Sequence, residues 1–389
     1  MKCEDSSTVQ PLAKRPPSEC HVITDGPQFS VDLECKKSLS DLESNIKLNN
    51  LNKLEMYNVD QMKIIIKFLF GILLLLAVSF LAANFYLPLK PEVLKFEFDP
   101  KSVSGDLDKY LKKSEEKIPG LLPDVHKRII WAHSEKNITP ISIVYIHGFS
   151  STSEEIRPLP DLIAEHFNAN LYFTRLAGHG QASGKLLKIS ASDWIYDVQE
   201  ALTIGKRIGQ KTIVICTSTG GTLIASTLAN KNLDYSADAV VLISPNFEMQ
   251  SFWAPFMTLP LSYHWAPKLF GQTQVFKPLS RLHEKYWSLI QPTTNIIELA
   301  YLVKFANGIK FEDINMPALF YYSDEDKVVN SKETQEVAQK WGGKTESIIV
   351  KLSKSDDPNI HVVVGKIRSP NQTDFAIKSV IKWITSLKL

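Results

Sequence analysis

A buried strand that turns sharply into a helix is encoded in the middle of this chain. Residues 213–217 (Ile-Val-Ile-Cys-Thr) lead to Ser218, and the sequence continues as Thr-Gly-Gly-Thr-Leu-Ile-Ala. Gly220 and Gly221 allow a tight turn where a Cβ would clash. A serine at such a turn projects its Oγ clear of the backbone, and the helix N-terminus behind it offers N–H groups to negative charge. The pattern predicts Ser218 as a nucleophile, with an ordinary helix N-cap as the alternative.

A second apolar strand is expected upstream and ends in a loop suited to binding an anion. Residues 141–146 are followed by His147 and Gly148. A glycine lets the next backbone N–H point into a site, so the N–H groups of Phe149 and Thr219 are candidate oxyanion donors. We expect His147 to support this loop through hydrogen bonds.

Acidic residues and a histidine follow two later strands. A strand expected over 318–323 leads to Asp324 and Asp326, and a further strand over 347–352 precedes His361. The resulting chain order is serine, acid, histidine, which is the order found in α/β-hydrolases and differs from that of chymotrypsin or subtilisin. Both aspartates are candidates for the acid at this point.

From about residue 128 to residue 389 the sequence resembles the α/β-hydrolase superfamily, and in particular its monoacylglycerol-lipase and carboxylesterase branch. Besides the serine turn and the His-Gly pair, residues 174–184 read Thr-Arg-Leu-Ala-Gly-His-Gly-Gln-Ala-Ser-Gly. This run is similar to the R-x-x-G-H-G-x-S-x-G loop of such enzymes. The sequence departs from the family pattern at Cys216 and at Ser323, where glycines are usual.

The resemblance implies a role for each candidate. The family spacing to the acid falls on Asp326, which leaves Asp324 as a turn residue. It also implies that His361 is the general base, that the loop histidine His179 is structural, and that Ser218 forms an acyl-enzyme. The chemistry requires no metal or cofactor, and the sequence has no H-E-x-x-H motif, no clustered cysteines and no Gly-rich phosphate loop.

The arrangement of apolar runs predicts an α/β fold with a mostly parallel central sheet and helices on both faces. Between the expected strands at 239–244 and 318–323, residues 246–316 form an insertion too long for a simple crossover, and we expect it to cap the active site. Strands are expected at 128–133, 141–147, 169–174, 212–217, 239–244, 318–323 and 347–352.

A long apolar segment lies before this domain. Residues 68–89 carry no formal charge, and about 20 apolar residues suffice to cross a bilayer. We therefore expect a polar, unstructured N-terminal tail over 1–62, a transmembrane helix over 63–88, a linker over 89–127 and the hydrolase domain over 128–389. Basic residues flank the span equally, so orientation rests on the tendency of such tails to stay in the cytosol, which places the enzyme on the opposite side.

Composition and the apolar insertion limit the classes of partner that we expect. The 44 basic and 42 acidic residues nearly cancel, which gives no indication of nucleic-acid binding. The insertion is rich in aromatic residues, which suggests an acyl ester or lipid substrate delivered from the membrane. Three hypotheses remain: a carboxylic ester hydrolase acting on substrates such as monoacylglycerols or lysophospholipids; a thioesterase, amidase or acyltransferase with the same triad; and a non-catalytic interaction module with this fold.

Overall fold

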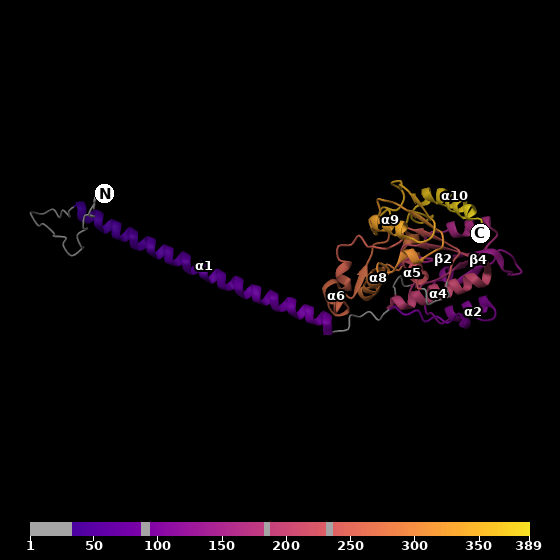
Figure 1. Cartoon of the computed structure of the whole chain (residues 1–389), viewed down its shortest axis with the longest axis horizontal. Helices are drawn as coiled ribbons and strands as arrows, with labels where there is room; N and C mark the ends of the chain where they lie inside the picture. Colours follow the sequence, from indigo (N-terminus) through magenta and orange to yellow (C-terminus); the bar gives the residue numbers. More distant parts are fainter. Residues whose placement is uncertain (1–32, 87–93, 183–186, 231–235) are drawn as a thin grey trace, which may run out of the picture. The chain divides into compact units, whose positions relative to one another are not determined.

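The computed structural model describes residues 33–86, 94–182, 187–230 and 236–389 (Figure 1). The chain divides into two compact units, Met1–Tyr86 and Leu87–Leu389. Each unit is described by itself.

The described residues of the first unit form one helix, α1 (Leu33–Tyr86). Within the described residues, α1 is the helix that is long and apolar enough to cross a membrane, over the segment Ser40–Ala82. In the described part of the chain none of this apolar window is buried; Phe68, for example, is 67% exposed. Such a surface is stable in hydrocarbon and unfavourable in water.

The first unit differs from the expected boundaries. The helix begins at Leu33 and not near residue 63, so residues 33–62 are helical although we expected an unstructured tail. This stretch has no proline or glycine and many leucine, lysine and glutamate residues, which favour helices, so nothing local stops the apolar helix from extending. Residues 1–32 of the expected tail lie outside the described residues.

A seven-stranded sheet forms the centre of the second unit, in the order β1-β3-β2-β4-β5-β8-β9. β1 pairs antiparallel with β3, and all other neighbours are parallel. This confirms the predicted mostly parallel sheet. The strands are β1 (Arg128–Ile130), β2 (Thr139–Ile146), β3 (Asn170–Phe173), β4 (Gly209–Thr217), β5 (Ala239–Ile243), β8 (Ala318–Tyr322) and β9 (Thr345–Ile349).

Helices cover both faces of this sheet. Alternate residues of the central strands enter two separate cores: Val214 and Cys216 of β4 pack with α4, α5, α8 and α9, whereas Ile213 and Ile215 pack with α3 and α10. This alternation is the expected result of the two-residue period of a strand. The helices are α3 (Leu159–His166), α4 (Ala191–Ile208), α5 (Thr219–Leu228), α8 (Thr293–Ala306), α9 (Ser331–Lys340) and α10 (Pro370–Leu387).

The insertion between β5 and β8 builds a separate layer with its own small core around Met257, Ala266 and Tyr301. Asn295 of α8, which is fully buried, joins this layer to the body by donating its side-chain N–H to the carbonyl of Leu187 at 2.7 Å. The remaining elements of the layer are η4 (Pro255–Thr258), α6 (Ser262–Phe270), β6 (Thr273–Val275), α7 (Arg281–Tyr286), β7 (Ile290–Pro292) and η5 (Phe311–Asp313).

Part of the segment expected to be a linker belongs to the hydrolase unit. It contains η2 (Pro100–Ser102), α2 (Leu107–Glu115) and η3 (Pro123–Val125). Leu94, Phe98, Val103, Leu107 and Leu111 join the core that contains α4. In Figure 1, α2 lies beside α4, and the phenol of Tyr110 donates to the carboxylate of Glu200 at 2.7 Å. The spacing of these apolar residues explains why this segment packs into the core and does not form a linker.

Candidate active site

Ser218 occupies the turn between β4 and α5 with φ 50° and ψ −116°. A residue with a side chain adopts this conformation only when its surroundings impose it. A Cβ added at Gly220 would lie 2.5 Å from the carbonyl oxygen of Ile146, and one at Gly221 would lie 2.8 Å from Pro245. The two glycines are therefore required by close packing. Ser218 occupies the N-cap position of α5, but its side chain makes no capping hydrogen bond there.

The structure brings the predicted serine, histidine and acid together. Nε2 of His361 lies 2.9 Å from Oγ of Ser218, and Nδ1 of His361 lies 2.8 Å from Oδ2 of Asp326. The second carboxylate oxygen of Asp326 accepts the backbone N–H groups of Val328 and Val329 at 2.7 and 3.0 Å. All three side chains are largely buried. The loop after β8 thus fixes the orientation of the acid, and the acid fixes the imidazole.

Nearby charges favour the protonated form of His361. Burial lowers the pKa of His361, but attraction to Asp326 and the hydrogen bond that the imidazole donates to this carboxylate outweigh burial, so the pKa is raised overall. Asp357 adds to the increase. It also accepts the backbone N–H groups of His361 and Val362 at 3.1 and 2.9 Å, so it holds the loop that carries the imidazole.

The rival candidates make other contacts. Asp324 is exposed and accepts a hydrogen bond from Gln335 at 3.0 Å. His179 is buried, and its ring bonds the carbonyl of Ala177 and the N–H of Ser150 at 3.0 and 2.9 Å. Burial lowers the pKa of His179 to about 4, so its ring is neutral near pH 7. Among the described residues, neither rival makes a hydrogen bond to Ser218.

The ring of His147 makes hydrogen bonds to backbone groups of two loops. Its Nδ1 bonds the carbonyl of Gly148 at 2.8 Å, and its Nε2 accepts the N–H of Leu176 at 3.0 Å. A Cβ added at Gly148 would lie 3.2 Å from Cβ of Ser218, so this loop runs directly against the serine. In the part of the chain that the structure describes, the N–H groups of Phe149 and Thr219 donate to no protein acceptor.

Two buried acids near the site were not identified from the sequence. Asp357 holds the loop of His361, and Glu155 bonds the N–H of Gly148 at 2.8 Å. In the sequence each looks like an ordinary loop carboxylate. The only indication of a role at the site is that each lies a few residues from a candidate site residue. The described residues contain no cluster of three or more His, Cys, Asp or Glu side chains that could hold a metal.

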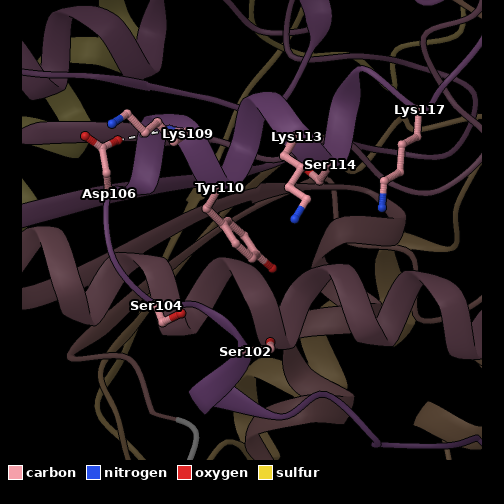
Figure 2. A pocket seen from close by; sticks show the side chains of 8 residues that line it. All are labelled: Ser102, Ser104, Asp106, Lys109, Tyr110, Lys113, Ser114 and Lys117. Carbon is pink, nitrogen blue, oxygen red and sulfur yellow. Dashed lines mark hydrogen bonds between the residues drawn. The ribbon is translucent and has the colours of Figure 1, made fainter.

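A polar hollow of about 460 Å³ lies elsewhere, between η2 and α2 (Figure 2). Figure 2 shows Tyr110 and Lys113 pointing into the space between these segments, whereas Lys109 lies beside Asp106. None of the three predicted triad residues lines this hollow, so it is separate from the site. Its lining consists of Ser102, Ser104, Asp106, Lys109, Tyr110, Lys113, Ser114 and Lys117.

Comparisons with known proteins agree with this fold. The family model described as serine aminopeptidase, S33, matches residues 140–351, more than half of the chain. The thermostable monoacylglycerol lipase of Bacillus sp. (strain H-257) is 26% identical over 216 residues, which cover 56% of this chain and 82% of that protein. A solved structure from work on LipS and LipT, two metagenome-derived lipolytic enzymes, is similar with a TM-score of 0.55 and 17% identity, covering 68% of this chain and 99% of the other. The chain belongs to the α/β-hydrolase superfamily, in the family described as serine aminopeptidase, S33.

Proposed function

We propose that this protein is a serine hydrolase that cleaves carboxylic esters through an acyl-enzyme. The observation that carries this proposal is the continuous hydrogen-bonded chain from Oγ of Ser218 through the ring of His361 to Asp326, at 2.9 and 2.8 Å. A serine hydroxyl is a weak nucleophile by itself, and an adjacent base oriented by a third group activates it.

In the acylation step, Oγ of Ser218 attacks the ester carbonyl carbon while Nε2 of His361 takes the hydroxyl proton. The resulting imidazolium is stabilised by Asp326, and the negative charge on the former carbonyl oxygen is bound by the N–H groups of Phe149 and Thr219. The tetrahedral intermediate collapses, and His361 gives its proton to the departing alcohol.

Water then releases the acyl group. Nε2 of His361 removes a proton from water, which attacks the acyl carbon, and the same two N–H groups bind the second oxyanion. The proton finally returns to Oγ of Ser218, and a free acid leaves. Of the groups that these steps use, Ser218 and Asp326 each lie within hydrogen-bonding distance of His361.

The cap supports a lipid-like substrate. Its surface presents apolar side chains that contact water, of which Phe252 is 73% exposed. Exposed apolar patches of this kind typically contact membranes, ligands or partner proteins. Together with the named activity of the Bacillus relative, this favours an acyl ester such as a monoacylglycerol or lysophospholipid. The exposed apolar residues of the cap include Phe252, Trp253, Leu269, Val275, Phe276, Leu279 and Leu282.

We further propose that α1 anchors the enzyme in a membrane, with the N-terminus in the cytosol and the hydrolase unit on the opposite side. The support for the anchor is the apolar run in the C-terminal half of the segment Ser40–Ala82. The support for the orientation is that internal anchors with short preceding tails usually leave the tail in the cytosol.

The test is hydrolysis of esters of one alcohol with acyl chains of increasing length, measured for the wild-type chain and for Ser218→Ala. We expect the rate to increase from short to long chains and to fall at least ~10⁴-fold in the variant. A preference for short, water-soluble esters would contradict the proposal that the substrate is a lipid. Activity on thioesters or amides but not on esters would instead select the second hypothesis, and a folded wild-type chain without any activity would select the interaction module.

A further inference from the structure

Glu155 is a buried acid on the far side of the His-Gly loop. It is 3% exposed. Its Oε2 accepts the backbone N–H of Gly148 at 2.8 Å and the phenol O–H of Tyr145 at 2.9 Å. A carboxylate that accepts hydrogen bonds from two buried donors is fixed in orientation, and such charge-assisted bonds are stronger than neutral ones.

Gly148 lies between this carboxyl group and the candidate nucleophile. A Cβ added to Gly148 would lie 3.0 Å from Oε1 of Glu155 and 3.2 Å from Cβ of Ser218. A side chain at this position would force one of these neighbours to shift by a few tenths of an ångström. Glycine is also the most flexible residue, so its conformation must be fixed by its partners.

Both peptide units that flank Gly148 are held by side chains. The carbonyl of Gly148 accepts hydrogen bonds from Nδ1 of His147 and from Oγ of Ser151, at 2.8 and 2.9 Å. Because a peptide is planar and trans, fixing this carbonyl also fixes the N–H of Phe149, which points the opposite way. Glu155 fixes the preceding peptide through the N–H of Gly148. The direction of the proposed oxyanion donor therefore depends on both contacts.

The same carboxyl group acts electrostatically on the candidate base. Burial raises the pKa of Glu155 and outweighs the hydrogen bonds from Gly148 and Tyr145, which favour the ionised form, so the pKa is raised overall. The charge of Glu155 raises the pKa of His361, after the larger effects of Asp326 and Asp357.

We propose that Glu155 is a positioning residue of this active site: it fixes the peptide that precedes the oxyanion donor, and its carboxylate stabilises the imidazolium of His361. The proposal rests on the proposed function, because it assigns Glu155 to the reaction of Ser218 and His361. It requires no contact between Glu155 and the substrate.

Two variants separate the two effects. Glu155→Gln keeps the size and one acceptor oxygen but removes the charge, so we expect kcat at the pH plateau to stay within ~3-fold of wild type and the midpoint of the acidic limb of kcat/KM to move to lower pH. Glu155→Ala also frees the N–H of Gly148, so we expect kcat to fall ~10- to 100-fold with little change in KM. A role in stability alone would not move the pH midpoint.

The matched control is Glu154→Gln, the neighbouring acid, which pairs with Arg157 at 2.7 Å. We expect its pH profile to match that of wild type. Thermal unfolding of every variant shows that it is folded at the assay temperature. Unchanged kcat and an unchanged pH midpoint in both Glu155 variants would overturn the proposal, as would an equal shift in Glu154→Gln. Retained activity in Ser218→Ala would instead overturn the proposed function itself.

Discussion

The backbone of Ser218 shows how single residues set up this site. Its positive φ is imposed by the packing of the turn, and it directs Oγ toward the imidazole 2.9 Å away. Cys216, which replaces the usual glycine, is compatible with this turn because it is fully buried and its thiol donates to the carbonyl of Val241. Burial raises the pKa of this thiol, which makes it an unreactive packing group.

The choice between the two aspartates gives a first prediction. Asp326→Asn keeps the shape of the acid but loses the carboxylate that stabilises the imidazolium, so kcat for ester hydrolysis should fall ~10⁴-fold. Asp324→Asn is the matched control, because Asp324 is exposed and bonds Gln335. Steady-state kinetics of both variants check this. Equal loss in the two variants, or loss only in Asp324→Asn, would contradict the assignment of the acid.

The ionisation of His361 predicts the pH dependence. Only the neutral imidazole can accept the proton of Ser218, so protonation inactivates the enzyme as the pH falls. Because Asp326 raises the pKa of His361 above its usual 6.5 in spite of burial, the midpoint of the acidic limb of kcat/KM should lie above 6.5. A pH–rate profile measures it. A midpoint well below 6.5, or no acidic limb, would contradict this account of the base.

At the scale of elements, the site depends on where strands end. Ser218, Asp326 and the His-Gly loop all follow parallel strands at their carboxyl ends, where sites of open α/β sheets lie. His361 comes from the loop after β9 and is held by Asp357. These loops meet only because β2, β4 and β8 belong to one sheet.

The turn between β4 and α5 has almost no free space, which gives the third prediction. Gly220→Ala would place a Cβ 2.5 Å from a backbone oxygen of β2, so the strand and the helix must separate. We expect a loss of ~1–3 kcal/mol in the free energy of unfolding and a slower reaction of Ser218. Gly71→Ala, where an added Cβ meets nothing within 4 Å, is the control. A stable and fully active Gly220→Ala chain would show that the turn is looser than described.

Much of this element-level organisation could be predicted from the sequence. The strands, and the serine, His-Gly pair and acid that follow them, can each be recognised in a short stretch of sequence. The predicted fold is confirmed. The roles of Glu155 and Asp357 could not be predicted, because their partners are backbone N–H groups whose positions depend on tertiary packing. The start of α1 was also missed, since a helix without a stop signal has no marked beginning in sequence.

At the scale of the whole molecule, the chain combines two units with different solvent requirements. The hydrolase unit buries its apolar residues in two cores on either side of the sheet, whereas α1 exposes nearly all of its own. A bilayer is the environment that suits such a helix. A membrane anchor and an exposed apolar cap would together bring the enzyme to a substrate that is poorly soluble in water.

The anchor gives the fourth prediction. Leu74→Arg combined with Leu75→Arg places two charges in the apolar centre of α1, at a cost of ~2.5–3.5 kcal/mol each on insertion. After alkaline carbonate extraction of membranes, the wild-type chain should remain in the pellet and the double variant should move to the supernatant. Leu48→Arg with Leu51→Arg, in the polar half of the helix, should stay in the pellet. Release of the wild-type chain would contradict a membrane-spanning α1.

The central claim is that Ser218 is activated by His361. The most direct measurement is to react the full-length protein with a fluorophosphonate and locate the adduct by peptide mass spectrometry, in wild type and in His361→Ala. The account predicts one adduct, on Ser218, and a rate of formation reduced by at least ~10³-fold in the variant. A folded wild-type protein without an adduct, an adduct on another residue, or equal rates in the two proteins would contradict it.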